Sequence, residues 1–181
     1  MTIDVELPPD SHDVRSQAER FKNTCRYNGA AHYLAATRYQ QRHIWLGIPA
    51  TILATVVGSS IFASLSDPIK GKPGVVIAAG LLSIIAAVLS GLQTFFGYAI
   101  LAETHKTAAA GYEVIRRDID LFILSEWETR ERVIAALSAI LEKMADLDKA
   151  SPAVPNWIYD QARRSIDSAD RSVANEIVAR R

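Results

Sequence analysis

The sequence predicts an all-α membrane protein in which a two-helix transmembrane hairpin is flanked by N-terminal and C-terminal cytoplasmic helices. Residues 44–66 and 74–102 contain no Asp, Glu, Lys or Arg, although 22% of the 181 residues are charged. A soluble domain needs charged side chains on the solvent-exposed faces of helices this long. The segment between them, residues 66–73, is rich in Pro and Gly and is short enough to connect only antiparallel neighbours.

The N-terminal part of the chain reads as a tail followed by a helix. Residues 1–13 hold two prolines and four acidic residues, which favours a disordered tail. A cytoplasmic helix is expected over residues 14–43. Its apolar positions Val14, Ala18, Phe21 and Cys25 repeat at spacings of three and four. Cys25 is the only cysteine, so we expect no intramolecular disulfide and a small buried side chain there.

Two apolar segments are each long enough to cross a bilayer. Residues 44–65 form the first predicted span, which covers the roughly 30 Å hydrocarbon core. Pro49 lies one turn inside it, and we expect the joint between the N-terminal helix and the span at this residue. Residues 74–102 form the second span. Its 29 residues exceed what a perpendicular helix needs, so tilt or emergence from the bilayer takes up the excess.

The remainder of the chain is predicted to be helical and cytoplasmic. Residues 103–124 form one helix, in which Tyr112, Ile115, Ile119 and Phe122 repeat at three and four. Residues 125–181 form a C-terminal helical tail, and residues 125–128 fit a capping box. The next apolar positions are Ile134, Leu137, Leu141 and Met144. Pro152 and Pro155 interrupt this pattern, and a last short helix begins near Asn156.

Basic residues beside the spans predict the orientation. Six lie on the terminal side of the spans and two lie in the connecting loop. They are Arg26, Arg38, Arg42, Lys106, Arg116 and Arg117, against Lys70 and Lys72. Both termini are therefore predicted to be cytoplasmic, in a multi-pass protein of the plasma membrane. Trp45 and Tyr98 lie where interfacial aromatic side chains are expected.

Small residues form a ladder along each span. On the second span the ladder comprises Ala79, Ser83, Ala87 and Gly91, and it is extended on the same side by Ser90, Thr94 and Gly97. On the first span it comprises Gly47, Thr51, Thr55 and Ser59. Such ladders let helices approach closely in lipid. Either both ladders pack the hairpin on itself, or one of them faces a neighbouring protomer of a homo-oligomer.

Three polar residues of the second span and its exit have two interpretations each. Gln93 is the only amide in either span, and it either hydrogen-bonds to a neighbouring helix or lines the constriction of a pore. Glu103 and His105 either end the span as an interfacial pair or form a ring of charge at a pore mouth. Two helices alone cannot enclose a hydrated path. A pore would need several hairpins in a ring, with Ser83, Ser90, Gln93 and Thr94 as its wall.

Composition and motifs exclude several function classes. The 20 basic and 20 acidic residues show no clustered basic excess, so we expect no nucleic-acid partner. None of the four histidines belongs to an H-E-x-x-H motif, and neither a G-x-S-x-G motif nor a P-loop is present. We expect no enzyme activity, no cofactor and no metal site.

Several runs of the sequence resemble a known family. The strongest is Leu-Ser-Gly-Leu-Gln-Thr-Phe-Phe at residues 89–96, followed by Ala-Glu-Thr-His-Lys at 102–106 and by Tyr112. Leu-Gly-Ile-Pro at 46–49 and the Arg-Tyr pairs at 26–27 and 38–39 also contribute. Residues 14–124 thereby resemble the SLATT domains, which are two-span effectors associated with nucleotide-sensing bacterial defence systems.

This resemblance implies an oligomeric pore-forming effector of a bacterial anti-phage or conflict system, gated through its cytoplasmic helices and acting by abortive infection. Its implied location is the bacterial inner membrane. Its implied partners are the lipid bilayer, further copies of itself, and a separate nucleotide-sensing or nucleotidyltransferase protein. No obvious second domain is present, so the signal is expected to reach the helical tail or to come from another protein. Two alternatives stay open: a membrane-anchored adaptor whose hairpin tethers a helical protein-binding module, and a constitutive channel unrelated to defence.

Overall fold

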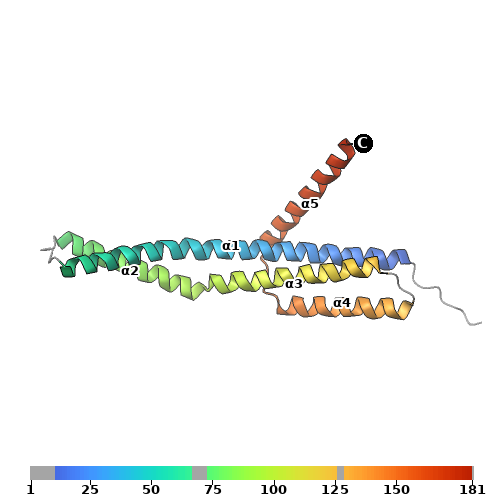
Figure 1. Cartoon of the computed structure of the whole chain (residues 1–181), viewed down its shortest axis with the longest axis horizontal. Coiled ribbons are helices and arrows are strands. Elements are labelled where there is room, and N and C mark those ends of the chain that lie inside the picture. The colour runs from blue at the N-terminus through green and yellow to red at the C-terminus, as the bar shows by residue number, and fades with distance from the viewer. Residues whose placement is uncertain (1–10, 67–72, 126–128, 181) are drawn as a thin grey trace, which may run out of the picture. The chain divides into compact units, whose positions relative to one another are not determined.

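The computed structural model describes residues 11–66, 73–125 and 129–180, and every regular element in these ranges is an α-helix (Figure 1). The prediction of an all-helical chain is therefore confirmed for this part of the sequence. The five helices are α1 (Ser11–Ser66), α2 (Pro73–Phe96), α3 (Tyr98–Leu124), α4 (Arg130–Ala150) and α5 (Asn156–Ala179).

The chain divides into two compact units. One comprises residues 1–36 and 104–181 and is called the core unit here, because it contains the main cluster of buried side chains. The other comprises residues 37–103 and is called the apolar unit. Both α1 and α3 contribute residues to each unit.

In the core unit, α1, α3 and α4 pack around one cluster of apolar side chains. Ala18 and Cys25 of α1 are buried, as are Ile115 and Ile119 of α3. Ile119 is fully buried, which places it at the centre of the cluster. The core positions predicted on these two helices are confirmed, because residues three and four apart share one helix face.

The predicted apolar stripe on α4 is wrong at two of its four positions, because Val133 and Ile140 pack in the core in place of Ile134 and Leu141. Ile134 is 53% exposed, whereas Val133 packs against the core and Ile140 is buried. The observed stripe comprises Val133, Leu137, Ile140, Met144 and Leu147. Both stripes satisfy the spacing of three and four, so periodicity alone does not distinguish them.

Polar contacts hold α5 against α1. The Arg26 guanidinium donates two hydrogen bonds to the Asp170 carboxylate, at 2.6 and 2.7 Å. The Tyr27 hydroxyl donates to Asp167 at 2.8 Å, and Ile158 is buried nearer the start of the helix. The break at residues 151–155 and the start at Asn156 are confirmed, but the helix has 24 residues and is not short.

Helix α1 is continuous where two segments were predicted. The expected 14–43 helix and 44–65 span are parts of one 56-residue helix, and the helix passes through Pro49 without a break. Proline removes one backbone hydrogen bond, and the rest of a long helix keeps its own. The expected joint at Pro49 is therefore not an interruption of the helix.

The second predicted span is interrupted where the sequence predicts continuity. Helix α2 ends at Phe96, Gly97 has a φ of +53°, and α3 then runs from Tyr98 through the expected boundary at 102/103. Glycine adopts this left-handed conformation without a Cβ clash. The predicted loop at 66–73 and the capping box at 125–128 lie mostly outside the described residues, as does most of the predicted tail at 1–13, of which residues 11–13 are helical.

Candidate functional site

Within the apolar unit, α1 contacts α2 and the start of α3 in an antiparallel sense. The rings of Tyr39 and Tyr98 stack with centroids 6.1 Å apart, and further along α1 His43 contacts Gln93. Helix α1 therefore runs in the opposite direction to α2 and α3: as residue numbers increase along α1, the numbers of the residues it contacts decrease.

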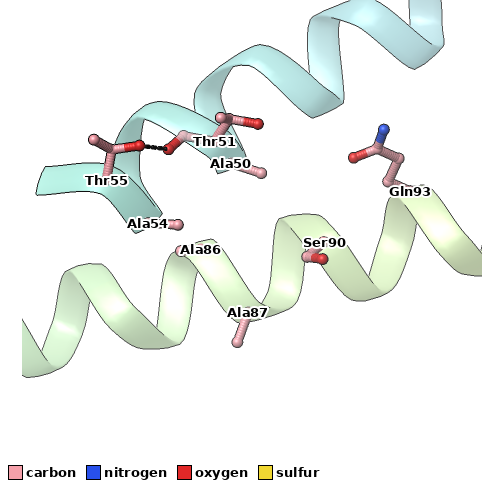
Figure 2. A pocket seen from close by; sticks show the side chains of 8 residues that line it. All are labelled: Ala50, Thr51, Ala54, Thr55, Ala86, Ala87, Ser90 and Gln93. Carbon is pink, nitrogen blue, oxygen red and sulfur yellow. Dashed lines mark hydrogen bonds between the residues drawn. The ribbon is translucent and has the colours of Figure 1, made fainter. Parts of the chain in front are cut away.

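Small side chains line an open groove between α1 and α2 (Figure 2), with a volume of about 560 Å³. Its lining residues are Ala50, Thr51, Ala54 and Thr55 from α1 and Ala86, Ala87, Ser90 and Gln93 from α2. Ala50 and Ala86 are buried there. Small residues therefore do allow the two helices to approach, but the buried alanines are not members of the predicted ladders.

Gln93 lies in the contact between the two helices. Its amide N–H donates to Nδ1 of His43 at 3.2 Å. A Cβ atom added to Gly47 would lie 2.9 Å from the Gln93 amide nitrogen, so the amide occupies space that only a glycine leaves open. Figure 2 shows the Gln93 side chain directed toward α1. This position agrees with the first of the two interpretations, a hydrogen bond to a neighbouring helix.

Two other ladder residues of α2, Ala87 and Ser90, line the open groove, and most of the ladder stays accessible to the surroundings. Ser83, Ala87, Ser90, Gly91 and Thr94 are exposed, whereas Ala79 and Gly97 are half-buried. A Cβ atom added to Gly91 would meet nothing within 4 Å. The ladder therefore presents a strip of small side chains that the described residues leave largely exposed.

Five hydroxyl groups of the two ladders donate hydrogen bonds to carbonyls of their own helices. Ser83 donates to the carbonyl of Ala79 at 3.0 Å, and Thr94 donates to the carbonyl of Ser90 at 3.1 Å. On α1, three hydroxyls donate in the same way at 2.8–2.9 Å, from Thr51, Thr55 and Ser59. Such bonds remove the cost of placing a hydroxyl in an apolar environment.

The apolar unit exposes most of its large side chains. Ile77, Ile84 and Phe95 are 63%, 62% and 82% exposed. One stretch of the described chain, Ile77–Leu124, is long and apolar enough to cross a membrane by length and composition; it spans α2 and α3 across Gly97. Its most apolar window has a mean hydropathy of 1.9, and only 6% of it is buried. The first predicted span, residues 44–65, is not identified in the search of the described residues and stays a prediction.

His105 lies in the core unit against a second histidine. Its Nδ1 atom is 3.0 Å from Nδ1 of His32, and both side chains are buried. The ring of Tyr112 stacks on His32 with centroids 5.5 Å apart, and its hydroxyl donates to Asp148 of α4. Glu103, the other predicted pore-mouth residue, is exposed. The interfacial Glu103–His105 pair and the ring of charge both stay predictions.

Burial sets the ionisation of this cluster, which lies outside the predicted spans. Burial lowers the pKa of His32 to about 4, and the neighbouring His105 adds to the effect. Burial also lowers the pKa of His105, so both rings are neutral at pH 7. Burial raises the pKa of the Cys25 thiol to about 11, which leaves it a thiol rather than a reactive thiolate.

Sequence reasoning missed the His32–His105 pair and the Tyr112–Asp148 bond. The histidines are 73 residues apart, and no short motif joins them. The one signal available is that Tyr112 belongs to a strong apolar stripe although it carries a hydroxyl, and a buried hydroxyl needs a partner.

Comparison with known proteins identifies no relative of this chain. No family model matches the chain, and neither a curated protein nor a solved structure does. Within residues 11–66, 73–125 and 129–180, no three His, Cys, Asp or Glu side chains lie close enough to share a metal ion.

Proposed function

We propose that this chain is a multi-pass protein of the bacterial inner membrane, and that several copies assemble into a pore that acts as an effector. Residues 44–65 and 74–102 form the two spans of a hairpin in this proposal, and both termini are cytoplasmic. The observation that carries it is the exposed apolar surface of α2, of which the most apolar window is only 6% buried. A core helix of a soluble protein would be mostly covered, and in this proposal lipid or further copies cover the exposed surface.

The polar strip on α2 supports an assembly around a shared axis. Ser83, Ser90 and Thr94 fall at spacings of seven and four, so they share one helix face. All three are exposed, and Ser90 also lines the open groove beside Gln93, which projects toward α1 on an adjacent face. In a ring of protomers, the wall of the path would consist of these hydroxyl-bearing residues, and Gln93 would hold α1 against α2. A pore lined only by Leu and Ile at this depth would tend to lose its water, and ion conduction would then stop.

The role in defence is supported by the resemblance to SLATT domains alone, through the run at residues 89–96. It implies that opening of the pore kills or arrests the infected cell after a nucleotide signal. In this proposal the core unit receives that signal, directly or through a separate nucleotide-sensing or nucleotidyltransferase protein. Comparing phage propagation in cells with and without the gene, together with its neighbouring genes, tests this part.

Dye release from liposomes tests the pore. Wild-type protein should release a small dye once it is incorporated, and the double variant Ser90→Ala/Thr94→Val should release it several-fold more slowly at equal density. Thr55→Val is the matched control, because Thr55 is exposed on α1 and makes the same bond to its own helix, at 2.8 Å. Equal release by the double variant and the wild type would remove these residues from the wall.

The position of Gln93 favours a second candidate, the membrane-anchored adaptor. An adaptor needs packing between its spans but no polar wall, and Gln93 is engaged in such packing. The core unit has its own apolar cluster and would serve as the binding module. Absence of dye release from correctly incorporated wild-type protein, at every density and after addition of cyclic oligonucleotides, would favour this candidate over the pore.

A further inference from the structure

A cation and two aromatic rings form a cluster at the end of the apolar unit where the first predicted span begins. The guanidinium carbon of Arg42 lies 5.9 Å from the ring centroid of Tyr39 and 5.9 Å from that of Tyr98. The two centroids are themselves 6.1 Å apart. The three groups therefore form a nearly equilateral triangle, within the range of cation–π attraction.

The aromatic part of this cluster continues into α2. The Phe96 ring stacks on Tyr98 with centroids 5.2 Å apart, and Phe95 lies 5.4 Å from Phe96. Gly97 makes this possible, because its positive φ turns the chain between Phe96 and Tyr98. Phe95 is 82% exposed, so the apolar edge of the cluster is open to its surroundings.

The charge of Arg42 is not balanced within the described part of the chain. The side chain is exposed, and its contacts there are the two tyrosine rings and no carboxylate. No acidic residue occurs between residues 22 and 44, so local sequence supplies none either. A guanidinium held on aromatic faces keeps its N–H edge available, and that edge matches the oxygens of a phosphate.

We propose that the triad Tyr39–Arg42–Tyr98 binds the phosphate of an anionic phospholipid headgroup in the leaflet that faces the cytoplasm. This inference rests on the proposed function, since it requires the apolar unit to lie in a bilayer. Amphipathic aromatic rings belong at headgroup depth, and basic side chains there attract anionic lipid. The exposed apolar edge at Phe95 would lie against the acyl chains of the same lipid.

Fluorescence quenching of Trp45 tests the proposal. Trp45 lies three residues after Arg42 and is 78% exposed. In a protein that also carries Trp127→Phe and Trp157→Phe, Trp45 is the only remaining tryptophan. Phosphatidylglycerol and phosphatidylcholine, each brominated near the headgroup end of its acyl chains, are compared at equal mole fraction in nanodiscs. The affinity of the site for phosphatidylglycerol should be about fivefold higher than its affinity for phosphatidylcholine. This ratio corresponds to about 1 kcal/mol, the contribution of one basic residue.

Arg42→Gln should abolish this preference, and Arg164→Gln is the matched control, because it removes the same charge from an exposed site in the core unit. If Arg42→Gln does not fold, the wild type still decides the matter, because its preference should fall as salt is raised. Equal quenching by the two lipids in the wild type would overturn the headgroup site while leaving insertion intact. Absence of quenching by either lipid would overturn both the site and the proposed function.

Discussion

Replacing Gln93 with leucine tests the contact that the structure places between α1 and α2. The substitution nearly preserves volume and removes the amide that donates to His43 at 3.2 Å. Interhelical hydrogen bonds within membranes contribute about 0.6 kcal/mol on average and about 1.7 kcal/mol at most. Leucine must also fit beside Gly47, where the amide nitrogen now lies 2.9 Å from the position of an added Cβ. We therefore expect Gln93→Leu to weaken the packing of α1 against α2 by about 1 kcal/mol.

A double-mutant cycle with His43→Leu isolates the hydrogen bond. Unfolding of the wild type, both single variants and the double variant is followed by circular dichroism in mixed micelles of increasing SDS fraction. The coupling energy between the two positions should be about 1 kcal/mol, because the double variant loses a bond that each single variant has already lost. Thr94→Val serves as the control, since Thr94 is exposed and bonds to its own helix.

Two results would contradict this reasoning. A coupling energy below about 0.3 kcal/mol would mean that Gln93 and His43 do not interact in the membrane. A sharp loss of dye release by Gln93→Leu, with unchanged resistance to SDS, would mean that the amide lines the pore and does not serve packing. Equal dye release at matched protein density is the outcome we expect.

Four further predictions follow from the two units. Gly91→Leu should leave the unfolding of the single chain unchanged, because an added Cβ meets nothing within 4 Å, but should reduce the oligomer size in light scattering if the ladder faces another protomer. Acidification should destabilise the core unit. The folded pKa of His32 is about 4 against an ordinary 6.5, so stability is intact above pH 6.5 and falls by up to about 3 kcal/mol towards pH 4; thermal melts should show a smaller fall in His32→Phe. Ile119→Ala should cost about 2–5 kcal/mol in denaturant unfolding, and Leu121→Ala, at a 64% exposed position, less than about 0.5 kcal/mol. A fluorescent protein fused after Arg181 should fluoresce, and an alkaline phosphatase fused there should be inactive, because basic residues predict a cytoplasmic C-terminus.

The parts of the fold that depend on one-dimensional patterns could be predicted from the sequence. Ala18, Cys25, Ile115 and Ile119 lie in the core because a helix of 3.6 residues per turn brings such spacings to one face. The stripe of α4 was misplaced, because Ile134 and Val133 both begin an acceptable repeat and only the packing partner selects one of them.

The break at Gly97 and the site contacts could not be predicted in the same way. A lone glycine in an apolar helix is ordinary in a membrane span, and no proline or Asn beside it marks a turn. The contacts Gln93–His43, Tyr39–Tyr98 and His32–His105 join residues 50, 59 and 73 positions apart. Such pairs depend on how the helices align, and periodicity carries no information about alignment.

The Nδ1–Nδ1 contact between His32 and His105 has a consequence for where their protons reside. A neutral imidazole carries one proton, on either Nδ1 or Nε2. Two Nδ1 protons would collide across 3.0 Å, and two bare Nδ1 atoms would set lone pair against lone pair. The two rings must therefore hold opposite tautomers, one with its proton on Nδ1 and the other on Nε2. Exchanging these roles requires two proton movements: one proton crosses the contact from Nδ1 to Nδ1, while the receiving ring releases its Nε2 proton and the other ring takes one up at Nε2. Nitrogen-15 NMR of the two imidazoles should accordingly show unlike tautomers, although both rings are buried and neutral.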